Sequence, residues 1–264
     1  MEDQEDVNRI IEKITGIYDI LCIDGRQKLP SFGKPYMRQA PNRLQALLNK
    51  EGINIKELGI STAIDFFMPS TTDFSRSWVG NLVAQYVNHD NPKIVTFGCS
   101  TGLEIYWIIH FLLKKGTLLS TTKIIGVDIN SKALEIARSA TYSKYYFDGS
   151  FYNKDGVEDV LLVDESLGTV CFPDHFKKSA EFLQGNLLDP NCFRVLEFEN
   201  LDIIVLMNVL KYMNSSAIQQ VLEIVNHSIR IGGILITDVY TFDIVSAHPN
   251  FESIGKYALK CISK

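Results

Sequence analysis

The stretch IVTFGCSTGLEIYW, residues 94–107, decides the fold of this chain. It begins as a short apolar run of the kind that forms buried strands, passes through two glycines, and continues with apolar residues at helical spacing. Gly98 and Gly102 enclose three small residues, and the acid Glu104 follows in the expected first helical turn. A strand, a glycine-bearing turn and a helix in this order predict the first unit of a doubly wound sheet, where ligands approach the turn.

The rest of the second half repeats this alternation of strand and helix. Near-continuous apolar strands that alternate with helices predict a parallel sheet covered by helices on both faces. The expected strands are 93–99, 123–129, 180–186, 201–208 and 232–239, and the expected helices are 102–116, 131–140 and 215–230. Residues 141–179 break the rhythm with clusters of Tyr, Asp, Gly and Lys, so we interpret them as an inserted subdomain with a small β element.

The front of the chain has a different character. Residues 7–22 and 40–52 place apolar side chains at helical spacing, and a turn-rich connector separates them. No strand pattern is visible there. The sequence therefore predicts a small all-α domain over 1–75, followed by an α/β, Rossmann-like domain over 76–264.

Composition narrows the function classes. The net charge of −5 argues against a nucleic-acid binder that works through bulk charge. The five cysteines are scattered, and no Cys/His spacing suits a metal site, so we expect no metal. The acidic, polar start MEDQEDVNR does not resemble a signal peptide, and no apolar run approaches the ~20 residues of a membrane span. We therefore expect a cytoplasmic protein without membrane insertion.

The ligand class follows from the turn and from Asp128, which ends the second expected strand. A carboxylate at this point commonly binds ribose hydroxyls. The alternative is a helix N-cap, a role that we expect Ser131 to fill. The spacing G-x-x-x-G differs from the dinucleotide pattern, and Glu104 beside a helix start disfavours phosphate but suits a sulfonium or ammonium. A cationic adenosyl ligand is favoured over NAD.

Motifs along nearly the whole chain resemble the CheR-type chemoreceptor methyltransferases, which use S-adenosylmethionine (SAM). The family pattern G-C-S-T-G-E-E-P-Y-S is similar to GCSTGLEIYW, and its R-N-V-x-I-Y-F motif is similar to MNVLKYMN at 207–214. DINSKALEIARSATYS at 128–143, GNLLDP at 185–190, and IRIGGILITD near the end also match in order. NRLQALLNKEGI and TAIDFFMPS in the front half resemble two further elements of the family.

The resemblance implies a helical domain joined to a class I SAM-dependent methyltransferase domain with a small β-subdomain, and S-adenosylhomocysteine (SAH) as product. Tyr212 would stand beside the transferring methyl group, or would be a packing aromatic. The two asparagines Asn186 and Asn208, expected to end adjacent strands, would contact the cofactor or merely cap loops. The full set of implied cofactor-binding residues is Gly98, Cys99, Ser100, Gly102, Glu104, Asp128, Ile129, Asn186, Leu187, Asn208 and Val209.

The chain also departs from the family. The arginine of the family's F-F-R element is replaced by Met68, which cannot grip a substrate carboxylate as a guanidinium does. Arg76 is a candidate replacement, or is a surface cation. Three functions stay open: methylation of a protein glutamate, methylation of a different small-molecule or peptide acceptor, and binding of SAM or SAH without catalysis.

The region 26–56 carries seven Lys or Arg residues against one acid. In the family a basic helix of the front domain docks the acidic methylation helices of the receptor. The resemblance thus implies an acidic helical protein partner, the chemoreceptor cytoplasmic domain, on this region. The alternative is an ordinary solvated face.

Overall fold

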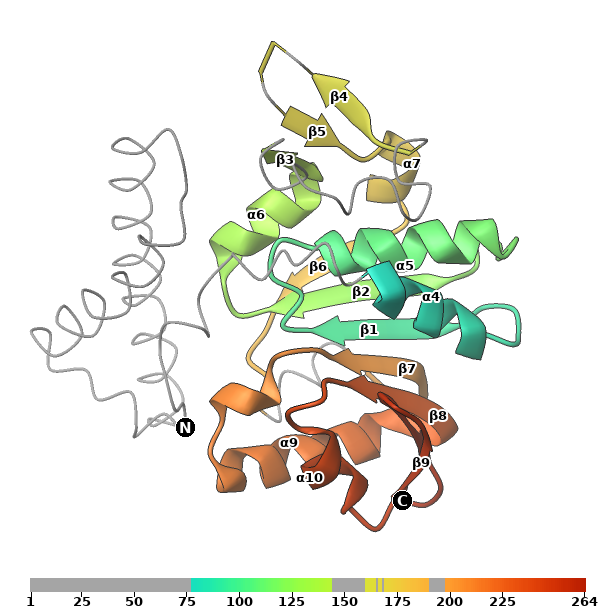
Figure 1. Cartoon of the computed structure of the whole chain (residues 1–264), viewed down its shortest axis with the longest axis vertical. Coiled ribbons are helices and arrows are strands. Elements are labelled where there is room, and N and C mark those ends of the chain that lie inside the picture. Colours follow the sequence, from blue (N-terminus) through green and yellow to red (C-terminus); the bar gives the residue numbers. More distant parts are fainter. Residues whose placement is uncertain (1–76, 144–159, 165, 168, 190–197) are drawn as a thin grey trace, which may run out of the picture. The chain divides into compact units, whose positions relative to one another are not determined.

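The computed structural model describes residues 77–143, 160–164, 166–167, 169–189 and 198–264 (Figure 1). Its main element is a seven-stranded sheet in the order β6-β2-β1-β7-β8-β10-β9. The five parallel strands of this sheet were all predicted from the sequence. They are β1 (Lys93–Phe97), β2 (Lys123–Asp128), β6 (Glu181–Gln184), β7 (Leu201–Leu206) and β8 (Ile229–Thr237).

The chain order along this sheet reverses beside β1. From β1 the chain moves to β2 and then β6 on one side, and it returns to β7 and β8 on the other side. The register is regular on both sides of β1, since Ile94 lies opposite Ile124 in β2 and Ile203 in β7. Ligands of open α/β sheets bind at the carboxyl ends of the strands where the order reverses. In this fold that point lies between β1 and β7.

Two strands that the sequence analysis missed complete the sheet. β10 (Ala258–Cys261) runs antiparallel to β8, and β9 (Phe251–Gly255) pairs antiparallel with β10 at the edge. The sheet is therefore mixed, and the prediction of a purely parallel sheet was wrong for its last two strands. Only Phe251 of β9 is buried, so this edge strand has no apolar pattern by which it could be recognised.

The helices follow the strands as predicted. α5 (Leu103–Lys114) follows β1, α6 (Ser131–Ser139) follows β2, and α9 (Ser215–Ser228) connects β7 with β8. The structure adds elements that the sequence did not predict: α4 (Ser77–Tyr86), the short helices α7 (Asp174–Lys177) and α10 (Phe242–Ser246), and the 3-10 turn η4 (Leu210–Tyr212).

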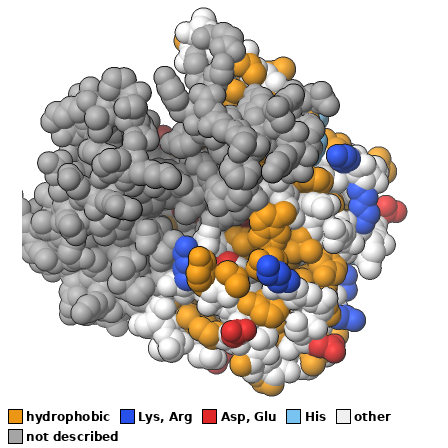
Figure 2. Space-filling model, in the orientation of Figure 1, with side chains coloured by type: hydrophobic (Ala, Val, Ile, Leu, Met, Phe, Trp, Pro, Cys, Tyr) orange, Lys and Arg blue, Asp and Glu red, His pale blue; other side chains and the backbone are white. Residues whose placement is uncertain are grey.

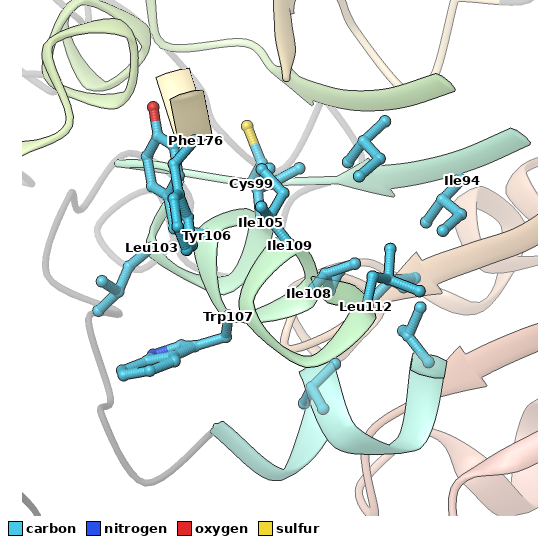
Figure 3. Close-up of a cluster of buried hydrophobic side chains, with 14 of the residues drawn as sticks. Ile94, Cys99, Leu103, Ile105, Tyr106, Trp107, Ile108, Ile109, Leu112 and Phe176 are labelled. Carbon is cyan, nitrogen blue, oxygen red and sulfur yellow. The ribbon is translucent and has the colours of Figure 1, made fainter. Parts of the chain in front are cut away.

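Helix α5 follows the glycine turn, and most of its side chains are buried. Its side chains are apolar on nearly every side, which requires cover on more than one face. Figure 3 shows Tyr106 beside Phe176 on one side of α5, while Trp107 points away from them. Helix α4 packs against α5, and Gly80 makes the approach close, since a Cβ there would lie 2.5 Å from the carbonyl oxygen of Trp107. This packing fixes the start of α5 and thereby the turn.

The expected insertion contains a second, three-stranded antiparallel sheet in the order β3-β5-β4. Its strands are β3 (Thr141–Ser143), β4 (Leu162–Asp164) and β5 (Thr169–Cys171). The buried ring of Tyr142 ties β3 to the main domain, because its hydroxyl donates a 2.8 Å hydrogen bond to the carbonyl oxygen of Thr101 in the glycine turn.

The chain divides into two compact units, residues 1–68 with 212–219 and residues 69–211 with 220–264. The predicted front helices, Met68, Arg76 and the basic region 26–56 lie outside the described residues. The domain limits 1–75 and 76–264 remain predictions. Among the described helices, none is both long enough and apolar enough to cross a membrane.

Candidate functional site

The turn after β1 is built from residues with left-handed backbone. Gly98, Ser100 and Gly102 have φ angles of 66°, 50° and 76°, which glycine adopts without strain and serine adopts only when it is held. The amide of Gly102 donates to the carbonyl oxygen of Cys99 at 2.9 Å and closes the turn. The amide of Cys99 donates to Val127 in β2 at 3.1 Å, so the turn extends the pairing of β1 with β2.

The two glycines allow close approach, but the neighbours that come close are protein side chains. A Cβ on Gly98 would collide with Cγ2 of Val209, from the loop after β7. A Cβ on Gly102 would lie 2.8 Å from both Ala137 of α6 and Phe182 of β6. The structure thus shows that both glycines allow neighbouring parts of the fold to pack closely, and their predicted contact with the cofactor stays a prediction.

Asp128 lies at the centre of the candidate site. Its carboxylate is 8% exposed, and its Oδ2 accepts a 2.7 Å hydrogen bond from the amide of Ser100 in the glycine turn. Its Oδ1 accepts a 2.9 Å bond from the amide of Asn130. Burial raises the pKa of Asp128 to about 6, although these amide bonds, which favour the charged form, oppose the rise. A buried carboxylate with so raised a pKa is stabilised by any donor or cation that reaches it.

The predicted cap of α6 was wrong by one residue. The side-chain oxygen of Asn130 accepts a 3.2 Å bond from the amide of Ala133, which is the bond an N-cap makes. Ser131 is instead the first residue of the helix. The conclusion drawn from the cap is unaffected, because Asp128 is still not needed to cap α6 and its carboxylate is directed at the glycine turn and at Asn130.

The end of β6 lies against the end of β2. The amide of Gly185 donates to the carbonyl oxygen of Asp128 at 3.0 Å, and the side chain of Gln184 donates to Ile129 at 3.2 Å. Asn186 is buried, and its side-chain oxygen accepts the amide of Leu188 at 2.9 Å. Asn186 therefore does organise its own loop, as the alternative reading held, while Leu187 beside it is also buried.

The end of β7 brings Asn208 and Val209 to the same edge. Asn208 has a left-handed backbone, with φ 57°, and Val209 packs on Gly98 across the point where the sheet order reverses. The expectation that Asn186 and Asn208 end adjacent strands was wrong, because β2 and β1 lie between β6 and β7. Three strand spacings separate them, about 14 Å, so only a ligand extended along this edge reaches both.

Asp238 is a site residue that the sequence analysis missed. It is 3% exposed at the end of β8, and its carboxylate accepts the amides of Asn208 at 2.9 Å, Tyr240 at 2.9 Å and Thr241 at 3.2 Å. It thus joins the loops after β7 and β8 as Asp128 joins those after β1 and β2. The available signal was its position, since it is a second acid directly after a buried strand.

The residues at this edge fit the predicted cofactor. Among the described residues, the buried hydroxyl of Ser100 has no hydrogen-bond partner, although it lies in the turn that contacts Asp128. Buried polar atoms of this kind are normally satisfied, so a ligand with polar groups is the expected partner. Glu104 is half-buried in the first turn of α5, near enough to Cys99 to contribute to its raised pKa. The carboxylates of Asp128 and Glu104 are thus suited to the hydroxyl and cationic groups of a bound cofactor.

For three other predicted site residues the structure gives either a structural role or no information. Burial, and then the charges of Asp128 and Glu104, raises the pKa of the Cys99 thiol well above its usual range. Cys99 is therefore a neutral packing group rather than a nucleophile. Tyr212 ends η4, but its side chain lies outside the described part, as does all of Arg76. Within the described residues no cluster of His, Cys, Asp and Glu is arranged to hold a metal ion.

Comparisons with known proteins agree with the motifs. Residues 66–238 match the family described as CheR methyltransferase, SAM binding domain. A probable biofilm formation methyltransferase, WspC of Pseudomonas aeruginosa, is 25% identical over 157 residues, which cover 59% of this chain and 36% of that protein. The chain thus spans little more than a third of the length of this curated relative.

Solved structures of methyltransferases resemble the chain more distantly. A TehB-like SAM-dependent methyltransferase from Corynebacterium glutamicum is 11% identical, with a TM-score of 0.41 over 88% of this chain and 100% of that one. A putative O-methyltransferase from Nostoc punctiforme is 16% identical, with a TM-score of 0.39 over 68% and 42%. The fold assignment depends on the strand order rather than on these low scores.

The sheet order, the glycine turn with its buried acid, and the matched residues lead to one assignment. The fold is the Rossmann-like fold of class I SAM-dependent methyltransferases, and the cofactor is SAM. The chain belongs to the CheR methyltransferase family, whose SAM-binding domain it contains.

Proposed function

We propose that this protein transfers the methyl group of SAM to a glutamate carboxylate of a chemoreceptor cytoplasmic domain. The observation that carries the proposal is the family match over residues 66–238. The other motifs quoted from the front half extend the likeness beyond that range. The name of the Pseudomonas relative, a probable biofilm formation methyltransferase, supports methyl transfer but names no acceptor.

The residues of the sheet edge have distinct parts in this proposal. Asp128 accepts hydrogen bonds from the ribose hydroxyls, and Glu104 faces the charged methionine portion of the cofactor. Asn186 and Leu187 border the adenine, at the β6 end of the edge. Asn208 and Val209 line the opposite end, which agrees with a ligand extended along the strand ends. The hydroxyl of Ser100 gains a polar partner when the cofactor is bound.

Methyl transfer from SAM to a carboxylate requires the protein mainly to position the two reacting groups. Bound SAM supplies an electrophilic methyl group on a positively charged sulfur. A glutamate acceptor is already ionised at neutral pH, so no general base is needed. The chain's own residues therefore act by orienting the two groups and by excluding water. Tyr212 is proposed to stand beside the methyl group, and Arg76 to guide the acceptor carboxylate in place of the arginine that Met68 replaces.

The test is a methylation assay with a defined acceptor. The protein is incubated with tritiated SAM and a chemoreceptor cytoplasmic fragment, and methanol released by base is counted. Label that is lost when the acceptor glutamates are changed to glutamine supports the proposal. An unlabelled fragment, when a known CheR methyltransferase labels the same preparation, contradicts it. The Asp128→Ala variant serves as the control that removes a proposed cofactor contact.

A second function, methylation of a different small-molecule or peptide acceptor, is favoured by Met68. Replacing the arginine by methionine should reduce the affinity for an uncharged acceptor less than the affinity for a carboxylate. Label that resists base but follows another acceptor distinguishes this function. Tight SAM binding without turnover on any acceptor would instead indicate a binding module.

The partner is proposed on separate grounds. The seven cations of region 26–56 would attract the acidic methylation helices of the receptor. The double variant Arg38→Glu with Arg43→Glu should weaken binding of the fragment and make that binding less sensitive to salt, while SAH binding stays unchanged. Equal affinity of the variant and the parent protein would leave the region without a docking role.

A further inference from the structure

The glycine turn is held by the inserted sheet as well as by β2. The amides of Cys99 and Ser100 both donate to β2. On the insertion side, the hydroxyl of Tyr142 in β3 donates its 2.8 Å hydrogen bond to the carbonyl oxygen of Thr101, the residue between Ser100 and Gly102. Tyr142 is 3% exposed, so this bond is made inside the protein.

The bond acts on one peptide group of the turn, the one that joins Thr101 to Gly102. The carbonyl of this peptide accepts the Tyr142 hydroxyl, and its N–H donates to the carbonyl oxygen of Cys99 at 2.9 Å. Gly102 has a φ of 76°, and because glycine tolerates many backbone angles, its side of the peptide presents little steric barrier to rotation. With both polar groups bonded, a rotation breaks two buried hydrogen bonds rather than one.

This peptide lies between the two acids that are proposed to contact the cofactor. On one side, the amide of Ser100 donates to the carboxylate of Asp128 at 2.7 Å. On the other side, the carbonyl of Gly102 accepts the amide of Tyr106 at 3.2 Å, and Glu104 lies in the first turn of the helix that begins there. A rotated peptide would move the start of α5 relative to β2, and therefore one acid relative to the other.

The tyrosine ring is itself fixed by its surroundings. Tyr142 pairs with Val170 in β5, and its ring meets the buried ring of Phe172 edge to face, with 6.2 Å between the centroids. A ring packed in this way holds its hydroxyl in place without a further loss of conformational freedom when a ligand binds. Burial raises the pKa of the Tyr142 hydroxyl well above its usual value, so the group stays protonated and remains a donor.

We propose that Tyr142 is a positioning residue for the cofactor: its hydroxyl fixes the peptide between Thr101 and Gly102, and the inserted sheet thereby contributes to SAM affinity through the turn. The inference rests on the proposed contacts between the cofactor and the turn, and it is independent of the acceptor. The competing explanation is that a buried tyrosine hydroxyl needs some acceptor, and that the bond serves stability alone.

Tyr106 offers a matched control that separates these two explanations. Its buried hydroxyl also donates to a main-chain carbonyl, that of Ala137 in α6, at 2.6 Å. Its ring contacts the same Phe172, with 4.8 Å between the centroids. Tyr106→Phe and Tyr142→Phe therefore each keep a buried ring and remove one hydroxyl with its bond to a carbonyl. Only Tyr142→Phe releases the glycine turn.

The test compares the full chain with these two variants. Calorimetry measures the Kd for SAH, and circular dichroism and urea denaturation measure the fold and its stability. Nuclear magnetic resonance of protein isotopically labelled in glycine follows hydrogen exchange of the Gly102 amide without ligand. We expect Tyr142→Phe to raise the Kd about five- to tenfold and to speed exchange of this amide by a similar factor. Tyr106→Phe should leave both within about twofold of the parent, although it also lowers the urea midpoint.

The outcomes separate this inference from the proposed function. Equal SAH affinities of the two variants overturn the inference, even if both are less stable than the parent. Unchanged exchange of the Gly102 amide in Tyr142→Phe also overturns it, because the hydroxyl would then not hold the turn. A parent protein that binds no SAH contradicts both proposals. A parent protein that binds SAH but methylates no glutamate contradicts the proposed function alone, and the comparison of the two variants still decides the role of Tyr142.

Discussion

The amide of Ser100 donates a 2.7 Å hydrogen bond to Oδ2 of Asp128, which joins the turn after β1 to the end of β2. The same carboxylate is the proposed acceptor for the ribose hydroxyls. Because each carboxylate oxygen accepts more than one hydrogen bond, the two roles are compatible. The contact also explains how Ser100 is held at a φ of 50°, in the left-handed region that serine seldom adopts.

Asp128 should make cofactor affinity depend on pH. Burial raises its pKa to about 6, and the ribose contact needs the ionised form. SAH affinity should therefore be constant above pH 7 and fall below pH 6, by up to about tenfold per pH unit. Calorimetric titration from pH 5 to pH 8 measures this, and Asp128→Asn should bind more weakly at pH 8 with a flat profile.

The same shift has the opposite effect on the free protein. Its folded-state pKa lies above the unfolded value of 3.8, so the folded state binds the extra proton between pH 4 and 6. This group therefore destabilises the fold above pH 6 and ceases to do so as the pH falls. A pH profile of SAH affinity that is identical in the parent and in Asp128→Asn would contradict the predicted ribose contact. An unfolding free energy with the same pH dependence in both proteins between pH 4 and 6 would contradict the statement on stability.

Gly98 should not tolerate a side chain. Its φ is +66°, and a Cβ would collide with Cγ2 of Val209. Backbone strain and the collision together should cost roughly 2–4 kcal/mol of unfolding free energy in Gly98→Ala. Urea denaturation measures the loss. The double variant with Val209→Ala should be less destabilised than the two single losses predict, because only the collision is relieved. Strict additivity would show that the contact is absent.

The part of the fold that the sequence predicted is the part with repeated signals. β1, α5 and β2 combine buried apolar strands, a left-handed glycine turn and an apolar helix, and each feature has one physical explanation. The position of Asp128 at the end of β2 was predicted from the same strand pattern, while its contact with the ribose stays a prediction. The resemblance to a family then supplied roles that spacing alone could not.

The features that the sequence did not predict have a different cause. They depend on which strands and loops pair in the folded protein. Strand β9 has one buried residue, so its place beside β10 is decided by an open sheet edge and not by its own pattern. The separation of Asn186 from Asn208 follows from strand order, which a single sequence does not state. Asp238 was overlooked because its hydrogen-bond donors come from a loop thirty residues away as well as from its own.

Asp238 should be more important for stability than its distance from the cofactor end suggests. Replacing it with alanine leaves three amide donors at the ends of β7 and β8 without their charged acceptor. The expected loss is about 2–4 kcal/mol in urea denaturation. The control is Asp243→Ala in α10, an exposed acid that should cost less than about 0.5 kcal/mol. If both variants lost the same unfolding free energy, Asp238 would have no specific role in holding the two loops together.

A polar cluster at the opposite ends of the strands suggests a pH-dependent term in stability. The carboxylate of Asp202 in β7 accepts the amide of Lys93 at 2.7 Å, Nε of Arg230 at 2.5 Å and Nε2 of His89 at 2.8 Å. Burial alone would raise the pKa of Asp202, but these donors together hold it below the usual value. On the face seen in Figure 2, the described surface carries basic and acidic side chains among hydrophobic ones.

His89 provides the titrating member of this cluster. Its contact with the carbonyl oxygen of Asp90, and then its bond to Asp202, raises its pKa above 6.5 against the opposing effect of burial. The protonated ring therefore stabilises the fold fully below pH 6.5, and the contribution is lost as the pH rises through the raised pKa. Because the side chain is 39% exposed, the term should stay below about 1 kcal/mol. We expect His89→Ala to be less stable than the parent at pH 5.5, with a gap that narrows by pH 8.5; a gap independent of pH would exclude the charged form from this role.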